Sequence, residues 1–399
     1  MMKNHSYSED IMSVILEKND KPMSYPIITV DSQHKLRLQF DDLSTKTRQF
    51  NYTLIHCTPD WKPSDLMASE YLEGFREGEI TDYEFSFNTL KEYNHYSLKF
   101  PTDDCLPYLS GNYIIFVYEN YDKEQPVLTR RFRISENSAK ISASLKRSSL
   151  VVHSDYCTEF DVSVNGLRST IGSDTRGCRL QILRNNNDDF VLDVDEPDFV
   201  KGNLLEYSSP RHMFLKSGNE YRYFNVKNHK YTTDKVANIR FTSPYYIFKL
   251  YPEEPAAYTY SYVQDINGKF LVTSDDTDYP ATEAEYVLVD FELKVDRPYM
   301  GHDLYLYGDF CESDFSERDR LSYNTDSKSY ELRRLLKQGF YNYMYVLRNV
   351  KNNVLTLENT ERNFYQTEND FVIYFYYKRP AGNYTQLLGV KIVNSQKKL

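Results

Sequence analysis

Hydrophobic residues alternate with polar ones at a period of two along much of this chain. Leu36, Leu38 and Phe40 are separated by Lys35, Arg37 and Gln39, and residues 82–87 and 96–100 repeat the pattern. Because neighbouring side chains of a strand point to opposite faces, this alternation indicates strands with one buried face. Residues 112–118 are nearly all apolar, which indicates a strand buried on both faces. With turn-forming Asp, Asn, Gly and Pro between such segments, the pattern predicts an all-β protein built from β-sandwiches.

Two breaks in the strand pattern indicate domain boundaries. A polar stretch covers residues 135–140, and a Pro-rich segment at 252–255 is followed by an Asp-Ile-Asn-Gly turn at 265–268 whose Asn-Gly pair is a hairpin signal. A chain of 399 residues is long enough for several domains. We therefore expect three consecutive immunoglobulin-like β-sandwich domains, at residues 1–137, 138–265 and 266–399.

Composition narrows the kinds of partner that the chain can have. The net charge of −10 argues against a nucleic-acid or anionic-membrane surface. The 37 tyrosines suit strand faces and contact surfaces, because the ring packs while the hydroxyl stays hydrated. The first ten residues lack the apolar core of a signal peptide. Two alternatives follow, a cytoplasmic protein or one whose signal has been removed from this sequence.

Residues that could support catalysis are scattered. The cysteines form no CxxC pair, so we expect unpaired thiols; they are Cys57, Cys105, Cys157, Cys178 and Cys311. His56 and Cys57 are adjacent on a predicted strand and should face apart, with Cys57 in a core and His56 on a surface or packed under Trp61. No metal-ligand spacing and no phosphate-binding glycine motif occurs. We predict no enzyme activity, no cofactor and no metal.

The last third of the chain leaves a second function class open. Residues 304–310 (LYLYGDF) and 337–346 (KQGFYNYMYV) resemble the early-set immunoglobulin-like modules that are related to glycogen-binding domains. This part of the chain contains no tryptophan of the kind that such modules use for starch. An envelope protein that binds glycans through tyrosine platforms is therefore the alternative function.

The N-terminal third carries sequence words that resemble a known family. The chain is similar to the type IX secretion system plug proteins of Bacteroidota, most strongly in the first domain. The matching words in that domain are residues 25–28 (YPII), 38–43 (LQFDDL), 56–61 (HCTPDW), 63–66 (PSDL), 70–75 (EYLEGF), 86–89 (SFNT), 95–98 (HYSL), 100–101 (FP), 110–113 (SGNY) and 128–132 (LTRRF). Later matches lie at 218–224, 265–268 and 337–343.

This resemblance implies a non-enzymatic, monomeric protein of the periplasm that associates with the outer membrane without inserting into it. Its implied partner is the β-barrel translocon of the secretion system, whose periplasmic opening the family is thought to close. The densest group of aromatic and charged residues supplies the candidate partner contacts, which are Trp61, Tyr71, Phe75, Arg76 and Tyr83. The alternative role for Trp61 and Phe75 is to hold the segment 63–75 against the first sandwich.

Overall fold

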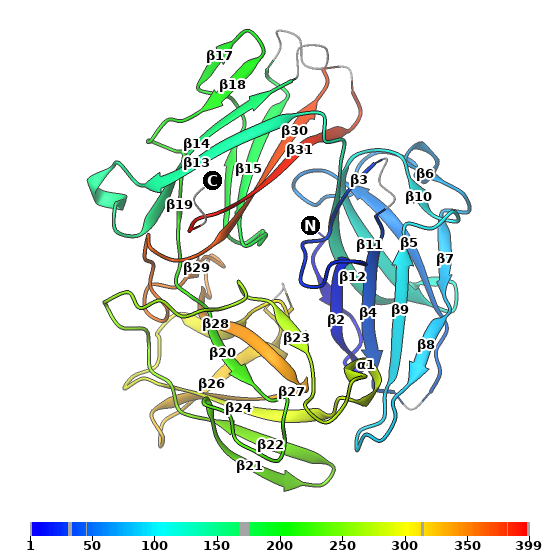
Figure 1. The fold of residues 1–399 in the computed structure, drawn as a ribbon, viewed down its shortest axis with the longest axis vertical. Coiled ribbons are helices and arrows are strands. Elements are labelled where there is room, and N and C mark those ends of the chain that lie inside the picture. The colour runs from blue at the N-terminus through cyan, green and yellow to red at the C-terminus, as the bar shows by residue number, and fades with distance from the viewer. Residues whose placement is uncertain are drawn as a thin grey trace.

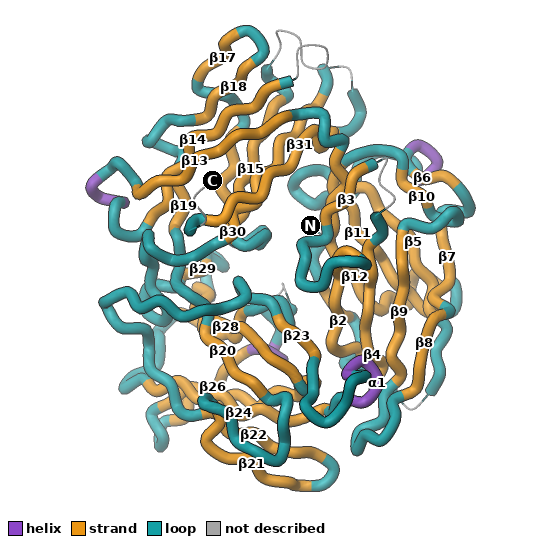
Figure 2. Tube along the Cα trace, viewed as in Figure 1, coloured by secondary structure: helices purple, strands orange, loops and turns teal. Residues whose placement is uncertain are grey.

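Strands make up most of the protein, and they form three groups around a common centre (Figure 1). The structure, a computed structural model, describes residues 2–30, 34–44, 46–166, 175–312, 315–380 and 382–396. The helical segments among these residues are single turns, α1 (Pro280–Glu283) and three 3-10 turns at Ala68–Glu70, Val151–His153 and Glu317–Asp319. Figure 2 shows the strands joined by loops and turns. The predicted all-β fold is confirmed.

The first sandwich consists of two sheets packed face to face. One sheet has the order β1 (His5–Ser6), β12 (Asp122–Ser135), β11 (Gly111–Glu119), β5 (Phe50–Cys57), β7 (Glu77–Ile80), with β3 (Ile27–Thr29) parallel to β12. The other has the order β2 (Ile11–Lys18), β4 (Leu36–Asp42), β9 (Asn94–Phe100), β8 (Asp82–Phe85). A small ribbon pairs β6 (Leu72–Glu73) with β10 (Leu106–Pro107).

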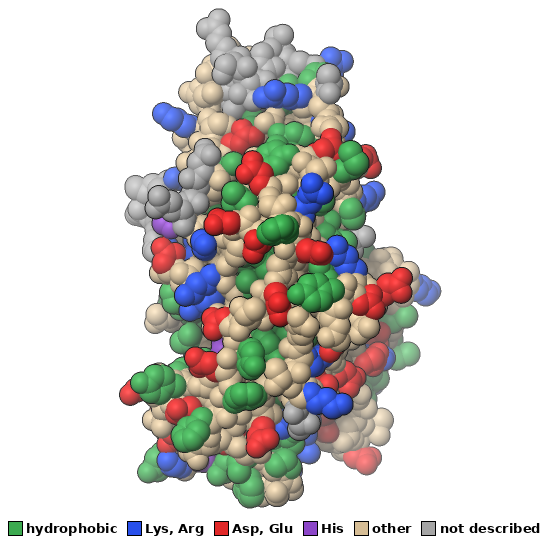
Figure 3. All heavy atoms as spheres, turned by 90° about the vertical axis from the view of Figure 1, so that its right-hand side faces the viewer, with side chains coloured by type: hydrophobic (Ala, Val, Ile, Leu, Met, Phe, Trp, Pro, Cys, Tyr) green, Lys and Arg blue, Asp and Glu red, His purple; other side chains and the backbone are tan. Residues whose placement is uncertain are grey.

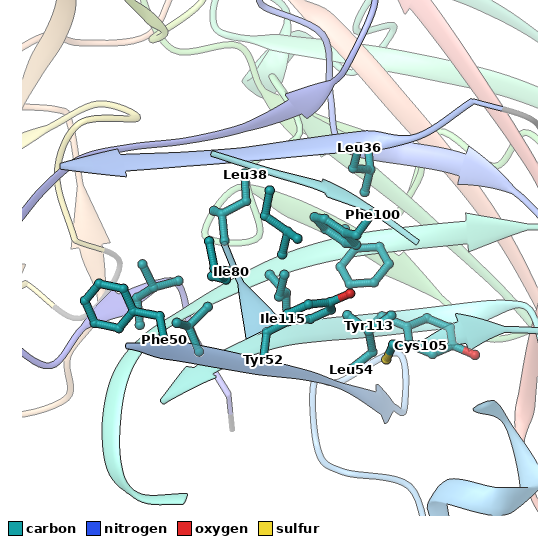
Figure 4. Close-up of a cluster of buried hydrophobic side chains, with 14 of the residues drawn as sticks. Leu36, Leu38, Phe50, Tyr52, Leu54, Ile80, Phe100, Cys105, Tyr113 and Ile115 are labelled. Atoms are coloured by element: carbon teal, nitrogen blue, oxygen red, sulfur yellow. The ribbon is translucent and has the colours of Figure 1, made fainter. Parts of the chain in front are cut away.

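The core of this sandwich follows from the alternation in the sequence. Leu36, Leu38 and Phe40 of β4 are fully buried in one core cluster. Leu36 and Leu38 face the opposite sheet, where Tyr113 and Ile115 of β11 lie (Figure 4). Each fully buried side chain of this kind contributes about 1.5–3 kcal/mol. β11 is buried on both faces, as its apolar sequence predicts.

The middle sandwich is assembled from strands distant in the sequence. One sheet has the order β13 (Lys140–Arg147), β14 (Cys157–Asn165), β18 (Leu204–Tyr207), β17 (Phe199–Lys201), with β19 (Phe214–Lys216) also on β14. The other has the order β16 (Val191–Val194), β15 (Cys178–Arg184), β30 (Asp370–Lys378), β31 (Thr385–Asn394). The apolar residues of the segment 150–153 favour a strand in the sequence, but the segment contains a 3-10 turn instead.

The third sandwich is a continuous sheet that curves around its core. Its order is β20 (Arg222–Asn225), β28 (Gly339–Asn349), β25 (His302–Tyr307), β26 (Arg320–Asn324), β27 (Ser329–Lys337), β24 (Tyr286–Lys294), β22 (Tyr245–Leu250), β21 (Val236–Thr242). β23 (Phe270–Val272) and β29 (Leu355–Thr356) also pair with β28. Phe224 stacks on Tyr341 in the core, with ring centroids 5.0 Å apart.

The strands of the middle and third sandwiches are not consecutive in the sequence, although three consecutive domains with boundaries at residues 137 and 265 were expected. β30 pairs with β15 over seven residues, so the end of the chain returns to the middle sandwich. β20, β21 and β22 lie before residue 265 but belong to the sheet of the third sandwich. The chain therefore crosses between the middle and third sandwiches twice, near residues 217–222 and 356–370.

Each pair of sandwiches shares a buried apolar cluster. The first and middle sandwiches share one that includes Tyr25 and Leu183. The first and third share Tyr93 and Tyr286, and Tyr307 in the third packs on Phe190 of the middle sandwich. Because interfaces that bury apolar side chains resist relative motion, the three sandwiches form one wide body.

Candidate docking face and the junction of the sandwiches

The five residues expected to contact a partner occupy different environments. Trp61 and Tyr71 are 1% and 6% exposed, so we assign them a structural role. Phe75 is 82% exposed, Arg76 is exposed, and Tyr83 is 40% exposed. Two of the five residues are therefore internal. The other three, Phe75, Arg76 and Tyr83, remain candidates for a contact with a partner.

Trp61 lies at the junction of the first and middle sandwiches. It follows β5 in a turn with a positive φ of 58°. The guanidinium groups of Arg131 and Arg133, from β12, lie 4.5 and 4.7 Å from the centre of its ring. Its indole N–H donates a 2.9 Å hydrogen bond to Asp188 of the middle sandwich. Trp61 thus joins two sandwiches instead of holding the segment 63–75.

Asp188 binds both of these arginines. Its carboxylate oxygens lie 2.9 Å from Arg131 and 2.7 Å from Arg133, whose side chains are 8% and 3% exposed. Burial acts to raise the pKa of Asp188, but Arg133, Arg131 and the hydrogen bond from Trp61 outweigh it and lower the pKa. The carboxylate is therefore ionised at neutral pH and compensates the buried guanidinium groups.

The loop that carries Asp188 also reaches the third sandwich. Residues 185–190 connect β15 to β16, and the Asn and Asp residues at 185–189 favour such a loop. The Tyr307 hydroxyl of β25 lies 2.7 Å from both Asn187 and Asp189. Asn186 accepts a hydrogen bond from Tyr374 of the middle sandwich itself. A single loop therefore contacts all three sandwiches.

A second charged junction joins the first sandwich to the third. Lys337 at the end of β27 lies 2.6 Å from Asp41 of β4, and both side chains are 1% exposed. His95 and the hydroxyl of Tyr286 each lie 2.7 Å from the same carboxylate. Burial acts to raise the pKa of Asp41, but Lys337 and His95 outweigh it, so the pKa is lowered. This ion pair is shielded from solvent and has a fixed geometry.

A group of carboxyls lies where the chain crosses between the middle and third sandwiches. Glu220 is 5% exposed and accepts hydrogen bonds from the Tyr260 hydroxyl and from the Glu368 backbone N–H. Burial raises the pKa of Glu220 to about 7, against the effect of these two bonds and with a further contribution from Asp265. Burial likewise raises the pKa of Asp265 to about 6. These carboxyls titrate near neutral pH.

We expect the Glu220→Gln variant to gain stability relative to the wild type as the pH rises. A carboxyl whose pKa is higher in the folded state stabilises the fold below its unfolded pKa, and this contribution is lost as the pH passes about 7. Between pH 5 and pH 8 the difference in unfolding free energy should shift by about 2–3 kcal/mol in favour of the variant. Urea denaturation at both pH values measures it. Glu358→Gln on the exposed surface is the control, and an equal pH profile for both variants would contradict the expectation.

His56 and Cys57 do not form a nucleophile and base pair. They face opposite sides of β5, and both are 1% exposed. Burial lowers the pKa of His56 to about 4 and raises that of Cys57 to about 12, so neither is poised for proton transfer at neutral pH. His56 packs on Tyr113, which corrects the expectation of a surface position or one under Trp61. In the described ranges, no group of three or more His, Cys, Asp or Glu side chains could hold a metal ion.

The outer edge of the first sandwich presents exposed aromatic side chains. β8 is an edge strand, so its outer hydrogen-bonding groups lack a neighbouring strand in the sheet. Phe85 and Phe87 are 64% and 70% exposed, although their alternation with polar residues predicts a buried face. Figure 3 views this side of the molecule, where hydrophobic side chains are interspersed with acidic and basic ones. The acidic residues on and near β7 and β8 are Glu73, Glu77, Glu79, Asp82 and Glu84.

The architecture defines a multi-domain β-sandwich protein whose domains are fixed to one another by buried polar and apolar contacts. Residues 11–136, the first sandwich, match the family model described as the type 9 secretion system plug protein first domain. The first sandwich is therefore a domain of the type 9 secretion system plug protein family.

One solved structure extends the similarity beyond the first domain. The crystal structure of a hypothetical protein from Parabacteroides merdae is 30% identical, with a TM-score of 0.94, and the match covers 99% of this chain and 100% of that one. The arrangement of all three sandwiches is thus shared with that protein. A Salmonella alpha-2-macroglobulin reacted with methylamine aligns with a TM-score of only 0.20 at 8% identity, over 98% of this chain and 27% of that one. No curated protein matches the chain. Within the described part of the chain, no helix has the length and apolar character needed to cross a membrane.

Proposed function

We propose that this protein docks on the periplasmic opening of an outer-membrane secretion barrel of the type IX system and closes it between transport events. The match of the first sandwich to the plug family is the observation that carries the proposal. The protein acts in the periplasm as a monomer and works by obstruction, without turning over a substrate.

The rigidity of the molecule supports a role of this kind. Domains of one chain move relative to one another unless their interface is large and apolar. Here buried apolar clusters join every pair of sandwiches, and the Asp188 and Lys337 junctions add charge pairs of fixed geometry. A body that does not flex between its domains can block an opening wider than any one domain.

The exposed edge of the first sandwich is the proposed docking face. Phe75, Arg76 and Tyr83 lie at this edge, and aromatic and arginine side chains contribute most of the energy in many interfaces. Acidic residues around them keep the face polar, which suits a contact that must release when a substrate passes.

Affinity capture from envelope extracts tests the docking proposal. The full-length protein is immobilised, and the bound proteins are identified by mass spectrometry. We expect the translocon barrel of the secretion system to be enriched over a control column. Extracts in which the barrel is abundant but not retained would contradict the proposal.

The triple variant Phe75→Ala, Arg76→Ala, Tyr83→Ala separates docking from folding. Phe75 and Arg76 are exposed, and Tyr83 is 40% exposed with its ring against Tyr96 and Phe85, so the free energy of unfolding should fall by no more than about 2 kcal/mol. Capture of the barrel should fall at least tenfold. Tyr231→Ala, at a 73% exposed tyrosine of the third sandwich, is the control and should retain full capture. Equal capture by both variants would place the docking face elsewhere.

A further inference from the structure

A cavity of about 340 Å³ lies on the third sandwich, apart from the proposed docking face. One wall is formed by residues 219–223, where the chain enters β20, and the other by residues 253–263, the loop after β22. Pro255, Ala257 and Val263 give the loop wall an apolar character. The cavity therefore combines an aliphatic wall with charged groups.

Most of these charged groups are paired within the protein. Arg222 lies 2.9 Å from Glu361 and 3.2 Å from Glu253. Glu253 also accepts a hydrogen bond from the Tyr343 hydroxyl, and Glu361 accepts one from the backbone of Tyr345. These contacts satisfy two of the carboxylates that line the cavity.

Glu220 differs from these carboxylates. It lines the cavity at 5% exposure, and its Oε1 accepts the hydrogen bonds from Tyr260 and Glu368 described above. Its Oε2 is buried and accepts no hydrogen bond from the described residues. A buried carboxylate oxygen without a donor is unfavourable, so a ligand that brings a donor gains binding energy there.

Several contacts hold the loop wall, among them the hydrogen bonds from Arg222 to the Glu254 carbonyl and from the Ala256 N–H to the Thr360 carbonyl. Arg362 packs over the ring of Tyr258 at 3.4 Å and donates a hydrogen bond to the backbone of Ala256. The Tyr260 hydroxyl donates a hydrogen bond to Glu220. Glu220 therefore both lines the cavity and anchors the loop that forms one of its walls. A ligand at Glu220 therefore also contacts the segment that determines the width of the cavity.

We propose that this cavity binds an organic cation, an ammonium or guanidinium group on a short aliphatic chain, with Glu220 as its counter-ion. The aliphatic part packs on the apolar loop wall, and the cationic group donates to Oε2 of Glu220. The cavity has more carboxylates than cations. Its carboxylates are Glu220, Glu254 and the paired Glu253 and Glu361, and its cations are Arg222 and Lys235. This balance favours a positive ligand over an anion or a neutral sugar.

Isothermal titration calorimetry with the full chain tests this site. The probes are agmatine and putrescine, with 1-butanol as the neutral analogue, at pH 8 where Glu220 is ionised. We expect one cation per chain and no heat from 1-butanol. Glu220→Gln should weaken binding at least tenfold, whereas Glu358→Gln, outside the cavity, should bind as the wild type does. Absence of binding by both cations, or unchanged binding by Glu220→Gln, would overturn the proposal.

The pH dependence and the source of the cation are measured in the same way. The affinity for agmatine and putrescine should rise about fivefold to tenfold from pH 6 to pH 8 as Glu220 ionises. The titratable groups that face Glu220 are Tyr260, Asp265 and Glu368. Tripeptides Gly-Lys-Gly and Gly-Arg-Gly carry the same groups on a polypeptide. Tighter binding of a tripeptide than of agmatine and putrescine identifies a protein side chain as the ligand, and the reverse order identifies a free amine. A flat pH profile would contradict the role of Glu220.

Discussion

Replacing Asp188 by alanine should lower the free energy of unfolding by about 3–5 kcal/mol. The substitution leaves Arg131 and Arg133 buried without their counter-ion and removes the acceptor of the Trp61 indole. Removing one partner from a buried charge cluster costs far more than the net contribution of the cluster, because the remaining charges stay desolvated. Urea denaturation at pH 7 measures the loss.

Trp61 makes this variant unusually easy to follow. It is the single tryptophan of the chain, so its fluorescence reports on the junction of the first and middle sandwiches alone. The emission of Asp188→Ala should shift even below the unfolding transition. Asp195→Ala, at a carboxylate that is 86% exposed on the same sandwich, should change neither the emission nor the stability by more than about 0.5 kcal/mol. A loss below about 1 kcal/mol in Asp188→Ala would show that the junction does not hold the sandwiches together.

Replacing Lys337 by methionine should cost a similar amount, about 3–5 kcal/mol at pH 7. Methionine keeps the length of the side chain but leaves the Asp41 carboxylate with the hydrogen bonds from His95 and from the Tyr286 hydroxyl. Because Asp41 has a lowered pKa in the wild type, its ionised form stabilises the fold above its unfolded pKa, and this contribution is lost as the pH falls below that value. The cost of Lys337→Met should therefore shrink as the pH falls below the unfolded pKa of 3.8.

A double variant separates the charge from the packing. Asp41→Asn combined with Lys337→Met removes both charges and should recover more than half of the loss. Lys216→Met, which breaks an ion pair between side chains that are 54% and 62% exposed, should cost less than about 1 kcal/mol. If Lys337→Met and Lys216→Met were equally mild, the first and third sandwiches would not be joined through Asp41.

The sequence predicts those parts of the fold that depend on local pattern. Leu36, Leu38 and Phe40 alternate with polar residues and are buried, and the Asn- and Asp-rich segment at 185–189 is a loop. The Asn267-Gly268 pair has positive φ at both residues, as its turn chemistry requires. It does not join paired strands, because β23 pairs with β28. A turn residue specifies its own backbone conformation and leaves the choice of strand partner open.

Long-range pairing lies outside the reach of such patterns. β15 and β30 are separated by almost half of the chain, and each reads simply as an apolar strand. Many pairings would bury those side chains, so periodicity alone does not assign the strands to sandwiches. The same limit explains β8, whose alternation resembles that of a core strand although it lies at an exposed edge.

The sequence also misses the junctions, for a related reason. Trp61 is conspicuous in the sequence, but its partners Arg131 and Asp188 lie 70 and 127 residues further along the chain. Asp41 and Lys337 stand in separate sandwiches and resemble ordinary surface residues in the sequence. Two features of the sequence mark Lys337 and Asp41. Lys337 lies between the apolar segments of two C-terminal strands, and Asp41 is one of two adjacent acids after the apolar residues of β4. Neither feature identifies a partner.

Conductance of the purified translocon barrel in a planar bilayer tests the central claim most directly. The barrel without this protein should carry a large, steady current. Adding the wild-type protein to the periplasmic side should reduce that current to near the bilayer baseline, and the Phe75, Arg76, Tyr83 variant should require at least a tenfold higher concentration. A current that is unchanged by saturating wild-type protein would contradict the account.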